Sequence, residues 1–301
     1  MRCPTDMAMS DVPIIFDREL LGARRRRAAA LGPATFLVER VAEDLSDRLA
    51  AVLRRFDHAL DLGTPTDAVR RALAQGGKVG RIDVADVQTG AGETLAVRAG
   101  GFDLVVSALV LQFVNDLPGM LAQIRRALRP DGLLLAALVG GDTLNELRAS
   151  FAAAEAEIEG GISPRVAPFA DLRDLGALLQ RAGLALPVTD VDRLTVRYSS
   201  PLALMHDLRR MGATNVLVER RRRPLRRATL ARMMEIYAAR FADPDGRIRA
   251  TFEIVWLSAW APHASQQQPL KPGTAKTRLA DALGTNEIST GEKTGPGDGN
   301  R

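Results

Sequence analysis

The sequence is poor in the residues that form disulfides and bind metals. Cys3 is its only cysteine, and the 301 residues include three histidines. A single cysteine cannot form a disulfide within the chain, and no Cys/His spacing typical of a zinc site is present. Three scattered histidines also give no recognisable set of two histidines and a carboxylate for iron. We therefore expect no metal site, and the lack of disulfides fits a reducing compartment such as the cytoplasm.

Long apolar runs and aromatic residues are scarce as well. No run of about 18 apolar residues occurs, so we expect no helix that spans a membrane. The first residues, MRCPTDMAMSDVP, lack an apolar stretch and contain Asp6 and Asp11, which is not the pattern of a signal peptide. Aromatic residues make up 4% of the chain, so leucine, valine and alanine must form its core.

Positive charge exceeds negative charge, and the excess is uneven. The chain has 41 basic and 36 acidic residues, with arginine runs in residues 24–27 and 219–227 (ERRRRPLRR). Such runs attract phosphates, acidic lipid head groups or acidic proteins, although a solvated helix face or loop is the simpler explanation. No aromatic side chains interleave with the runs, which argues against a nucleic-acid partner.

Apolar strand patterns alternate with amphipathic helix patterns from residue 57 onward. The expected strands are residues 58–63, 78–86, 100–114, 133–140, 184–198 (an outer strand or hairpin) and 249–262. The expected helices are residues 66–77, 116–132, 142–161, 170–183, 201–212 and 227–242. This alternation predicts an α/β fold with a mostly parallel sheet and right-handed crossovers.

The pattern predicts one domain over residues 14–263. Within it, residues 14–55 form a helical N-terminal extension, and residues 200–245 form a helical insert before the last strand. Residues 1–13 and most of residues 264–301 are expected to be disordered. The latter are rich in Gln, Pro, Gly, Thr and Lys, and they cannot bury enough apolar surface to fold alone.

Polar residues and glycines gather where the expected parallel strands end, which is where such sheets bind ligands. Gly63 follows the first strand, where a glycine lets the backbone approach a ligand closely. Asp83, about twenty residues after Asp61, can accept hydrogen bonds from a ribose. A dinucleotide would require further glycines to hold its pyrophosphate, and Asp67 would repel phosphate. S-adenosylmethionine has no phosphate and fits this loop better, although a strand–turn–helix junction without a ligand remains an alternative.

Residues 100–135, GGFDLVVSALVLQFVNDLPGMLAQIRRALRPDGLLL, preceded by DLG and ID, resemble class I S-adenosylmethionine-dependent methyltransferases over residues 55–140. The resemblance implies a Rossmann-like, seven-stranded, mostly parallel sheet. Residues 15–30, 140–148, 159–183, 204–215 and 250–275 are similar to the methyltransferase-like assembly factors of respiratory complex I, in a bacterial version. The biotin-synthesis malonyl-carrier-protein methyltransferases are more distantly similar.

The resemblance implies S-adenosylmethionine as cofactor and a set of residues that contact it. These residues are Asp61, Leu62, Gly63, Thr64, Asp83, Val84, Glu93, Ser107 and Ala108. Glu93 stands near the family's third acidic position, where this sequence has no aspartate. Pro65 and Asp67 replace the usual further glycines, and no catalytic residue can be named from the sequence.

The same resemblance implies a protein substrate, a subunit of complex I, modified by methyl transfer or by arginine hydroxylation. A non-catalytic assembly chaperone with a decayed cofactor loop is the first alternative. A small-molecule methyltransferase of the biotin pathway or an RNA methyltransferase is the second. We expect a cytoplasmic protein, and peripheral attachment to the inner membrane remains open.

Overall fold

The computed structural model describes residues 13–89, 92–169, 172–267, 281, 284 and 285. The chain divides into two compact units, Met1–His263 and Ala264–Arg301, and all the helices and strands named below lie in the first unit. The disorder expected for residues 1–13 and 264–301 concerns segments that lie mostly outside the described residues.

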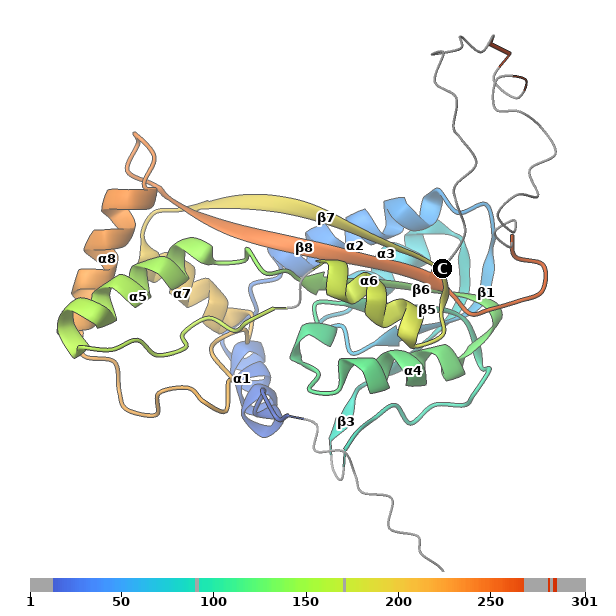
Figure 1. Cartoon of the computed structure of the whole chain (residues 1–301), viewed down its shortest axis with the longest axis horizontal. Coiled ribbons are helices and arrows are strands. Elements are labelled where there is room, and N and C mark those ends of the chain that lie inside the picture. Colours follow the sequence, from blue (N-terminus) through green and yellow to red (C-terminus); the bar gives the residue numbers. More distant parts are fainter. Residues whose placement is uncertain (1–12, 90–91, 170–171, 268–280, 282–283, 286–301) are drawn as a thin grey trace, which may run out of the picture. The chain divides into compact units, whose positions relative to one another are not determined.

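A six-stranded sheet forms the centre of the fold (Figure 1). Its order is β2 (Val79–Ala85), β1 (Phe56–Leu62), β5 (Phe102–Ala108), β6 (Leu128–Val139), β8 (Ile248–Trp260) and β7 (Ala185–Tyr198). Only β8 runs antiparallel to its neighbours. The carboxyl ends of β1, β2, β5 and β6 therefore lie along one edge, where the sequence predicts the ligand.

The expected count of seven strands is wrong for the part of the chain that the structure describes. Only 16 residues, 86–101, separate β2 from β5. An additional parallel strand would need two crossover connections of about a dozen residues each, which this segment cannot supply. It forms instead a small antiparallel pair, β3 (Gln88–Thr89) and β4 (Glu93–Thr94).

Helices cover both faces of the sheet. The helices α2 (Phe36–Ala50) and α3 (Ala68–Gly76) pack on one face, and α4 (Leu117–Ala127) and α6 (Leu172–Arg181) pack on the other. Every residue of β5 is buried, as expected of a strand covered on both sides. The predicted helix 116–132 was too long, because β6 already begins at Leu128.

The remaining helices gather beyond the carboxyl edge of the sheet. They are α1 (Arg18–Ala30), α5 (Asn145–Glu159), α7 (Pro201–Arg210) and α8 (Arg227–Phe241). Figure 1 shows the long β7–β8 ribbon extending from the sheet toward α5, α7 and α8. The expected helical insert before the last strand is confirmed, since α7 and α8 lie between β7 and β8.

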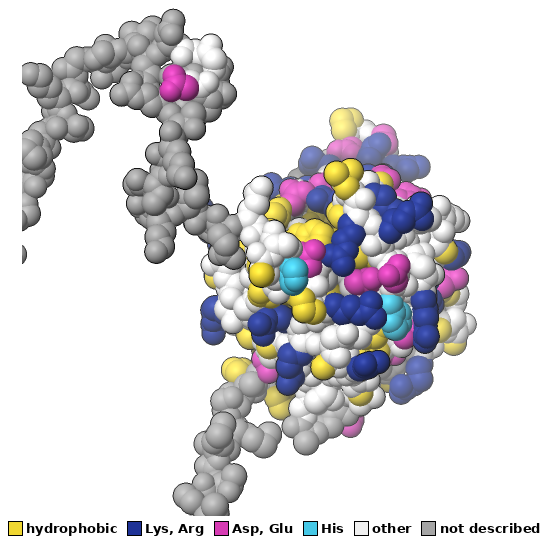
Figure 2. All heavy atoms as spheres, turned by 90° about the vertical axis from the view of Figure 1, so that its right-hand side faces the viewer, with side chains coloured by type: hydrophobic (Ala, Val, Ile, Leu, Met, Phe, Trp, Pro, Cys, Tyr) yellow, Lys and Arg dark blue, Asp and Glu magenta, His cyan; other side chains and the backbone are white. Residues whose placement is uncertain are grey.

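The expectations about membrane-spanning helices and about surface charge concern the described residues as a whole. No helix among them is both long enough and apolar enough to cross a membrane. On the face in Figure 2, arginine and lysine side chains alternate with acidic ones and form no continuous basic patch.

Candidate functional site

The turn after β1 requires glycine. Gly63 has φ +68° and its N–H donates to the Ala85 carbonyl at 2.8 Å. A Cβ at Gly63 would lie 3.0 Å from Cγ1 of Val110 and 3.5 Å from Oδ1 of Asp86. The turn is therefore pressed against the ends of the neighbouring strands, with a carboxylate at its side.

Asp61 shapes this turn from within. Its side chain is fully buried and accepts hydrogen bonds from Thr64 Oγ1 at 2.5 Å and from Arg70 Nη1 at 2.8 Å. Burial raises the pKa of Asp61, and the hydrogen bonds from Thr64 and Arg70 oppose that rise. Both carboxylate oxygens thus have partners inside the protein. Leu62, next in β1, is also buried.

Two acidic residues lie near the end of β2, and they differ in their surroundings. Asp83 is paired with His58 Nε2 at 2.8 Å and with Arg81 Nε at 2.8 Å. Asp86 is the first residue after β2; its carboxylate is exposed and lies beside Gly63. Asp86 was not singled out in the sequence, where it falls within the expected strand 78–86, whereas β2 ends at Ala85 and Asp86 follows it.

The other predicted contact residues are partly engaged elsewhere. Glu93 accepts a hydrogen bond from the Asp116 N–H at 2.9 Å and lies 3.4 Å from Arg18 Nε. Ser107 is buried and donates to the Leu62 carbonyl at 2.9 Å. Ala108 is buried next to it, whereas the Val84 side chain is exposed on β2. Their contact with a cofactor stays a prediction.

The two residues that replace the usual glycines point to different environments. Pro65 is exposed and lines the cavity described below. Asp67 precedes α3 and its carboxylate lies 3.5 Å from Arg71 Nε. The ion pair with Arg71 reduces the repulsion that Asp67 would exert on a carboxylate bound in the turn.

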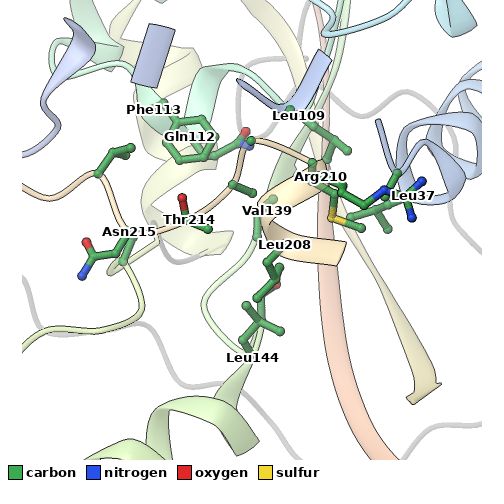
Figure 3. A pocket seen from close by; sticks show the side chains of 18 of the residues that line it. Leu37, Leu109, Gln112, Phe113, Val139, Leu144, Leu208, Arg210, Thr214 and Asn215 are labelled. Atoms are coloured by element: carbon green, nitrogen blue, oxygen red, sulfur yellow. The ribbon is translucent and has the colours of Figure 1, made fainter. Parts of the chain in front are cut away.

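A cavity of about 350 Å³ adjoins the turn (Figure 3). It is enclosed by α1, α2, α5, α7, the loop 211–216 and the ends of β5 and β6, and Pro65 and Thr66 form part of its wall. Most of its lining is apolar, including Leu37, Phe113, Val139, Leu147, Leu208 and Phe252. A site of this size and polarity is typical of small-molecule or side-chain binding.

Two lining leucines have strained backbones. Leu109 follows β5 with φ +57°, and Leu144 precedes α5 with φ +54°. Each is held by a backbone hydrogen bond of 2.8 Å, from Leu109 N–H to the Ala137 carbonyl and from Leu144 N–H to the Thr251 carbonyl. Strained residues of this kind concentrate at functional sites, and both face the same cavity.

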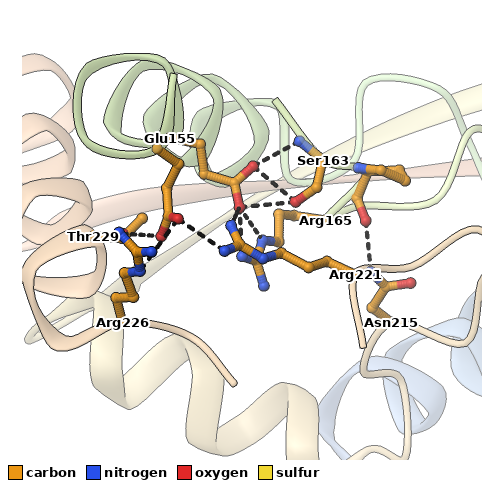
Figure 4. Close-up of polar contacts among 9 residues, drawn as sticks. Glu155, Ser163, Arg165, Asn215, Arg221, Arg226 and Thr229 are labelled. Carbon is orange, nitrogen blue, oxygen red and sulfur yellow. Dashed lines mark hydrogen bonds and ion pairs between the residues drawn. The ribbon is translucent and has the colours of Figure 1, made fainter. Parts of the chain in front are cut away.

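A network of ion pairs fixes one wall of the cavity (Figure 4). Glu155 of α5 is fully buried and accepts hydrogen bonds from the Ser163 N–H at 2.7 Å and from Arg165 Nε at 2.8 Å. Glu159, at the end of α5, pairs with Arg221 at 2.8 Å and accepts from Thr229 Oγ1 at 2.6 Å. The loops that carry Ser163 and Arg221 are thereby tied to α5.

The arginine run 219–227 is therefore partly structural. Arg220 pairs with Asp17 at 3.1 Å, and Arg226 lies 3.5 Å from Glu159. Arg222 and Arg223 are exposed, and neither forms an ion pair within the part of the chain that the structure describes.

Three further polar residues near this end of the sheet or in α7 do not form a catalytic group with one another in the described part of the chain. Asp142 pairs with Arg193 at 2.6 Å, and Arg148 donates to the Gly141 carbonyl at 3.3 Å. His206 is exposed on α7. Among the described residues, no three His, Cys, Asp or Glu side chains come together in a way that could hold a metal.

The sheet order, the Gly63 turn and the acid after β2 define a methyltransferase-type α/β fold. A family profile described as a methyltransferase domain matches residues 44–136, and the chain is a member of the S-adenosylmethionine-dependent methyltransferase superfamily. It is 35% identical over 287 residues to the mitochondrial arginine-hydroxylase NDUFAF5 of Danio rerio, which covers 89% of each chain. It is 37% identical over 294 residues to NDUFAF5 of Homo sapiens, covering 91% of this chain and 85% of that one. The chain belongs to the NDUFAF5 family.

Two further matches are weaker. The malonyl-[acyl-carrier protein] O-methyltransferase of Laribacter hongkongensis is 40% identical over 181 residues, covering 60% of this chain and 58% of that one. The solved N-methyltransferase NodS from Bradyrhizobium japonicum, in complex with S-adenosyl-L-homocysteine, is 14% identical, with a TM-score of 0.41. It covers 81% of this chain and 99% of that one.

Proposed function

We propose that this protein binds S-adenosylmethionine at the Gly63 turn and acts on a protein substrate during the assembly of respiratory complex I. The observation that carries the proposal is the tight Gly63 turn with the exposed Asp86 carboxylate beside it, next to an apolar cavity that Pro65 and Thr66 help to line. A close backbone turn and an exposed carboxylate suit an adenosyl ribose, whose two hydroxyls donate hydrogen bonds. The relatives named as arginine hydroxylases support a protein side chain as the acceptor.

The chain's own residues have distinct parts in this proposal. Asp86 would hold the ribose hydroxyls, and the bare Cα of Gly63 would leave room for the adenosyl group. The apolar walls of the cavity would exclude water from the reacting side chain. When bound, S-adenosylmethionine supplies an activated methyl group. Methyl transfer and arginine hydroxylation are the two candidate reactions, and the mass gained by the substrate distinguishes them.

Calorimetry with S-adenosylhomocysteine tests the cofactor site. We expect micromolar-range binding to the wild type and at least a tenfold loss in Asp86→Asn. Asp83→Asn is the matched comparison, because it removes the same charge from the same strand end. If the wild type does not bind S-adenosylhomocysteine, the proposal is rejected. If Asp83→Asn loses more affinity than Asp86→Asn, Asp83 and not Asp86 binds the ribose.

Mass spectrometry tests the substrate. Complex I subunits from a strain that lacks this gene are compared with those from the parent strain. We expect a mass gain of a methyl group or of one oxygen on a single peptide, present in the parent and absent in the deletion strain. Identical subunits in both strains would argue against a modifying enzyme.

A non-catalytic chaperone is the second candidate, favoured by the occupied Asp61 carboxylate and by Pro65 in the turn. A chromosomal Asp86→Asn substitution distinguishes the two. The chaperone predicts normal complex I assembly after cofactor binding is lost, whereas the enzyme predicts an assembly defect with the folded variant present.

We also propose a cytoplasmic location with peripheral attachment to the inner membrane. Exposed Arg222 and Arg223 support it, because arginines without an internal partner can meet acidic head groups. Co-sedimentation with anionic vesicles, which Arg222→Glu plus Arg223→Glu should abolish, is the test.

A further inference from the structure

The charged residues that line the cavity are all of one sign. They are Arg25, Arg165 and Arg210, and no aspartate or glutamate of the described chain lines the cavity. A guanidinium or ammonium ion in this space would meet like charges and apolar carbon. The lining thus disfavours a cationic ligand and favours an anionic one.

Two of the three arginines already have partners. Arg165 donates to Glu155 and lies over the Phe151 ring, with 5.3 Å from its guanidinium carbon to the ring centroid. Arg210 donates to the Gly32 carbonyl at 2.7 Å and lies 3.8 Å from an Asp207 oxygen.

Arg25 differs from both. It is half-buried on α1 and makes no hydrogen bond or ion pair with any residue that the structure describes. Desolvation by burial lowers the pKa of Arg25, the like charge of Arg18 adds to this, and the charge of Asp86 opposes it. An arginine remains protonated in spite of such a shift. Within the described chain, Arg25 is therefore a cation of the cavity whose charge lacks a close counter-ion, which is costly in a partly desolvated place.

A second polar group in the cavity also lacks a partner. Oε1 of Gln112, in the short 3₁₀ helix Leu111–Phe113, is buried and accepts no hydrogen bond from any residue that the structure describes. Figure 3 shows the Gln112 amide within the cavity lining, with Thr214 and Asn215 nearby. Buried polar atoms are rarely left unsatisfied, so a donor from a ligand is expected at this oxygen.

Other polar lining groups are occupied. Thr143 Oγ1 donates to the Glu253 carbonyl, Thr214 Oγ1 accepts from Arg24, and Asn215 Nδ2 donates to the Pro164 carbonyl. Thr66 Oγ1 accepts from the Ala68 N–H. Among the described lining side chains, Arg25 is thus a charged donor without a partner, and Gln112 Oε1 is a neutral acceptor without one.

We infer that the cavity binds a carboxylate carried on an apolar body, with the carboxylate on Arg25 and an N–H or O–H of the same ligand on Gln112 Oε1. The source of the carboxylate rests on the proposed function: it is the amino-acid end of the cofactor or an acidic group of the substrate. A substrate arginine would therefore not place its guanidinium against this wall.

Binding of two charge-opposed probes to the full-length protein tests the inference without any cofactor. Octanoate and octylammonium have the same chain and differ in the charge of the head group. Calorimetry should give at least tenfold tighter binding of octanoate. Arg25→Gln should weaken octanoate binding at least tenfold. Arg26→Gln makes an equal charge change at an exposed position of α1 and should leave octanoate binding unchanged.

Gln112→Glu provides a second variant of nearly unchanged shape. The new carboxylate should weaken the binding of octanoate and strengthen the binding of octylammonium, so that the variant prefers octylammonium. Equal binding of the two probes to the wild type, or octanoate binding that is unchanged in Arg25→Gln and Gln112→Glu, would overturn the inference.

Two nucleosides identify the source of the carboxylate. S-adenosylhomocysteine has the amino-acid end, and 5′-methylthioadenosine lacks it. If Arg25 holds the cofactor, Arg25→Gln weakens S-adenosylhomocysteine about tenfold and leaves 5′-methylthioadenosine unchanged. If Arg25 holds the substrate, both nucleosides bind Arg25→Gln as they bind the wild type, while the variant still binds octanoate at least tenfold more weakly. If the wild type binds neither nucleoside, the proposal that it binds S-adenosylmethionine is rejected. The comparison of octanoate with octylammonium would still test the inference that the cavity binds a carboxylate.

Discussion

His58 Nε2 lies 2.8 Å from Asp83 Oδ2, across the pair of strands β1 and β2. The hydrogen bond from His58 is the main cause that lowers the pKa of Asp83, with desolvation opposing it. The His58 ring also contacts Phe102, with 4.8 Å between ring centroids. The acid that the sequence identifies with a ribose thus has a structural partner within the sheet.

The first prediction concerns this pair. His58→Phe should keep the ring contact with Phe102 and remove the hydrogen bond, so the pKa of Asp83 should rise toward its ordinary value. NMR titration of the Asp83 carboxyl carbon measures the change. The affinity for S-adenosylhomocysteine should stay within about twofold of the wild type, and a tenfold loss would show that the pair serves the cofactor.

The second prediction concerns crowding at the Gly63 turn. Gly63 and Gly77 have similar positive φ values, +68° and +64°, but a Cβ at Gly77 would meet nothing within 4 Å. Gly77→Ala should therefore lower the free energy of unfolding by about 1 kcal/mol, from backbone strain alone. Gly63→Ala should lower the free energy of unfolding further, because its Cβ meets Val110. It should also weaken S-adenosylhomocysteine binding. Urea denaturation and calorimetry of the two variants separate strain from crowding, and equal values for both would contradict the tight turn.

The sequence predicts the position of the site better than its chemistry. Gly63 follows β1 as expected, because the strand pattern and the glycine turn are local signals. Asp86 was missed, because the expected strand 78–86 includes it, whereas β2 ends at Ala85 and leaves the Asp86 carboxylate beside the Gly63 turn. Arg25 and Gln112 could not be predicted from the sequence. Their significance depends on which charges and hydrogen bonds remain unpaired in the cavity, and segments far apart in the chain determine that.

The strand count shows a similar limit. The family resemblance implies seven strands, whereas the 16 residues between Ala85 and Phe102 are too few for an additional parallel strand. Loop length was available in the sequence and would have corrected the count.

The third prediction concerns the partner of buried Asp61. Arg70→Met removes a hydrogen bond to a charged group and should lower the free energy of unfolding by about 2 kcal/mol at pH 7. Burial already raises the pKa of Asp61, and the substitution should raise it further. Because protonation then relieves the buried charge, the difference from the wild type should shrink as the pH falls through the folded pKa toward the ordinary value of 3.8.

Urea denaturation between pH 7 and pH 4 measures this difference. Arg71→Met is the control, since Arg71 is mostly exposed and lies at 3.5 Å or more from its acidic neighbours. Its effect should be small and nearly independent of pH. A difference for Arg70→Met that stays constant with pH would exclude a role of the Asp61 charge.

The last prediction concerns the wall of the cavity. Burial raises the pKa of Glu155, but hydrogen bonds from the Ser163 N–H and from Arg165 outweigh it, and the net pKa is lowered from 4.5. A lowered carboxyl pKa stabilises the fold above the unfolded value, and the stabilisation is lost as the pH falls through the folded value. Glu155→Gln should cost about 3 kcal/mol at pH 7, since it leaves Arg165 without its partner. Hydrogen exchange should then accelerate in residues 161–169.

In the wild type, the same acceleration should begin only when the pH falls below about 4.5. Glu157→Gln is the matched control, because Glu157 lies on the same helix and its ion pair with Arg232 is exposed. It should leave exchange in residues 161–169 unchanged at pH 7. The two variants should also differ in function: loosening of this wall should weaken octanoate binding in Glu155→Gln, whereas Glu157→Gln should bind it as the wild type does. If Glu155→Gln keeps both its exchange protection and its octanoate affinity, the network does not hold the cavity in shape.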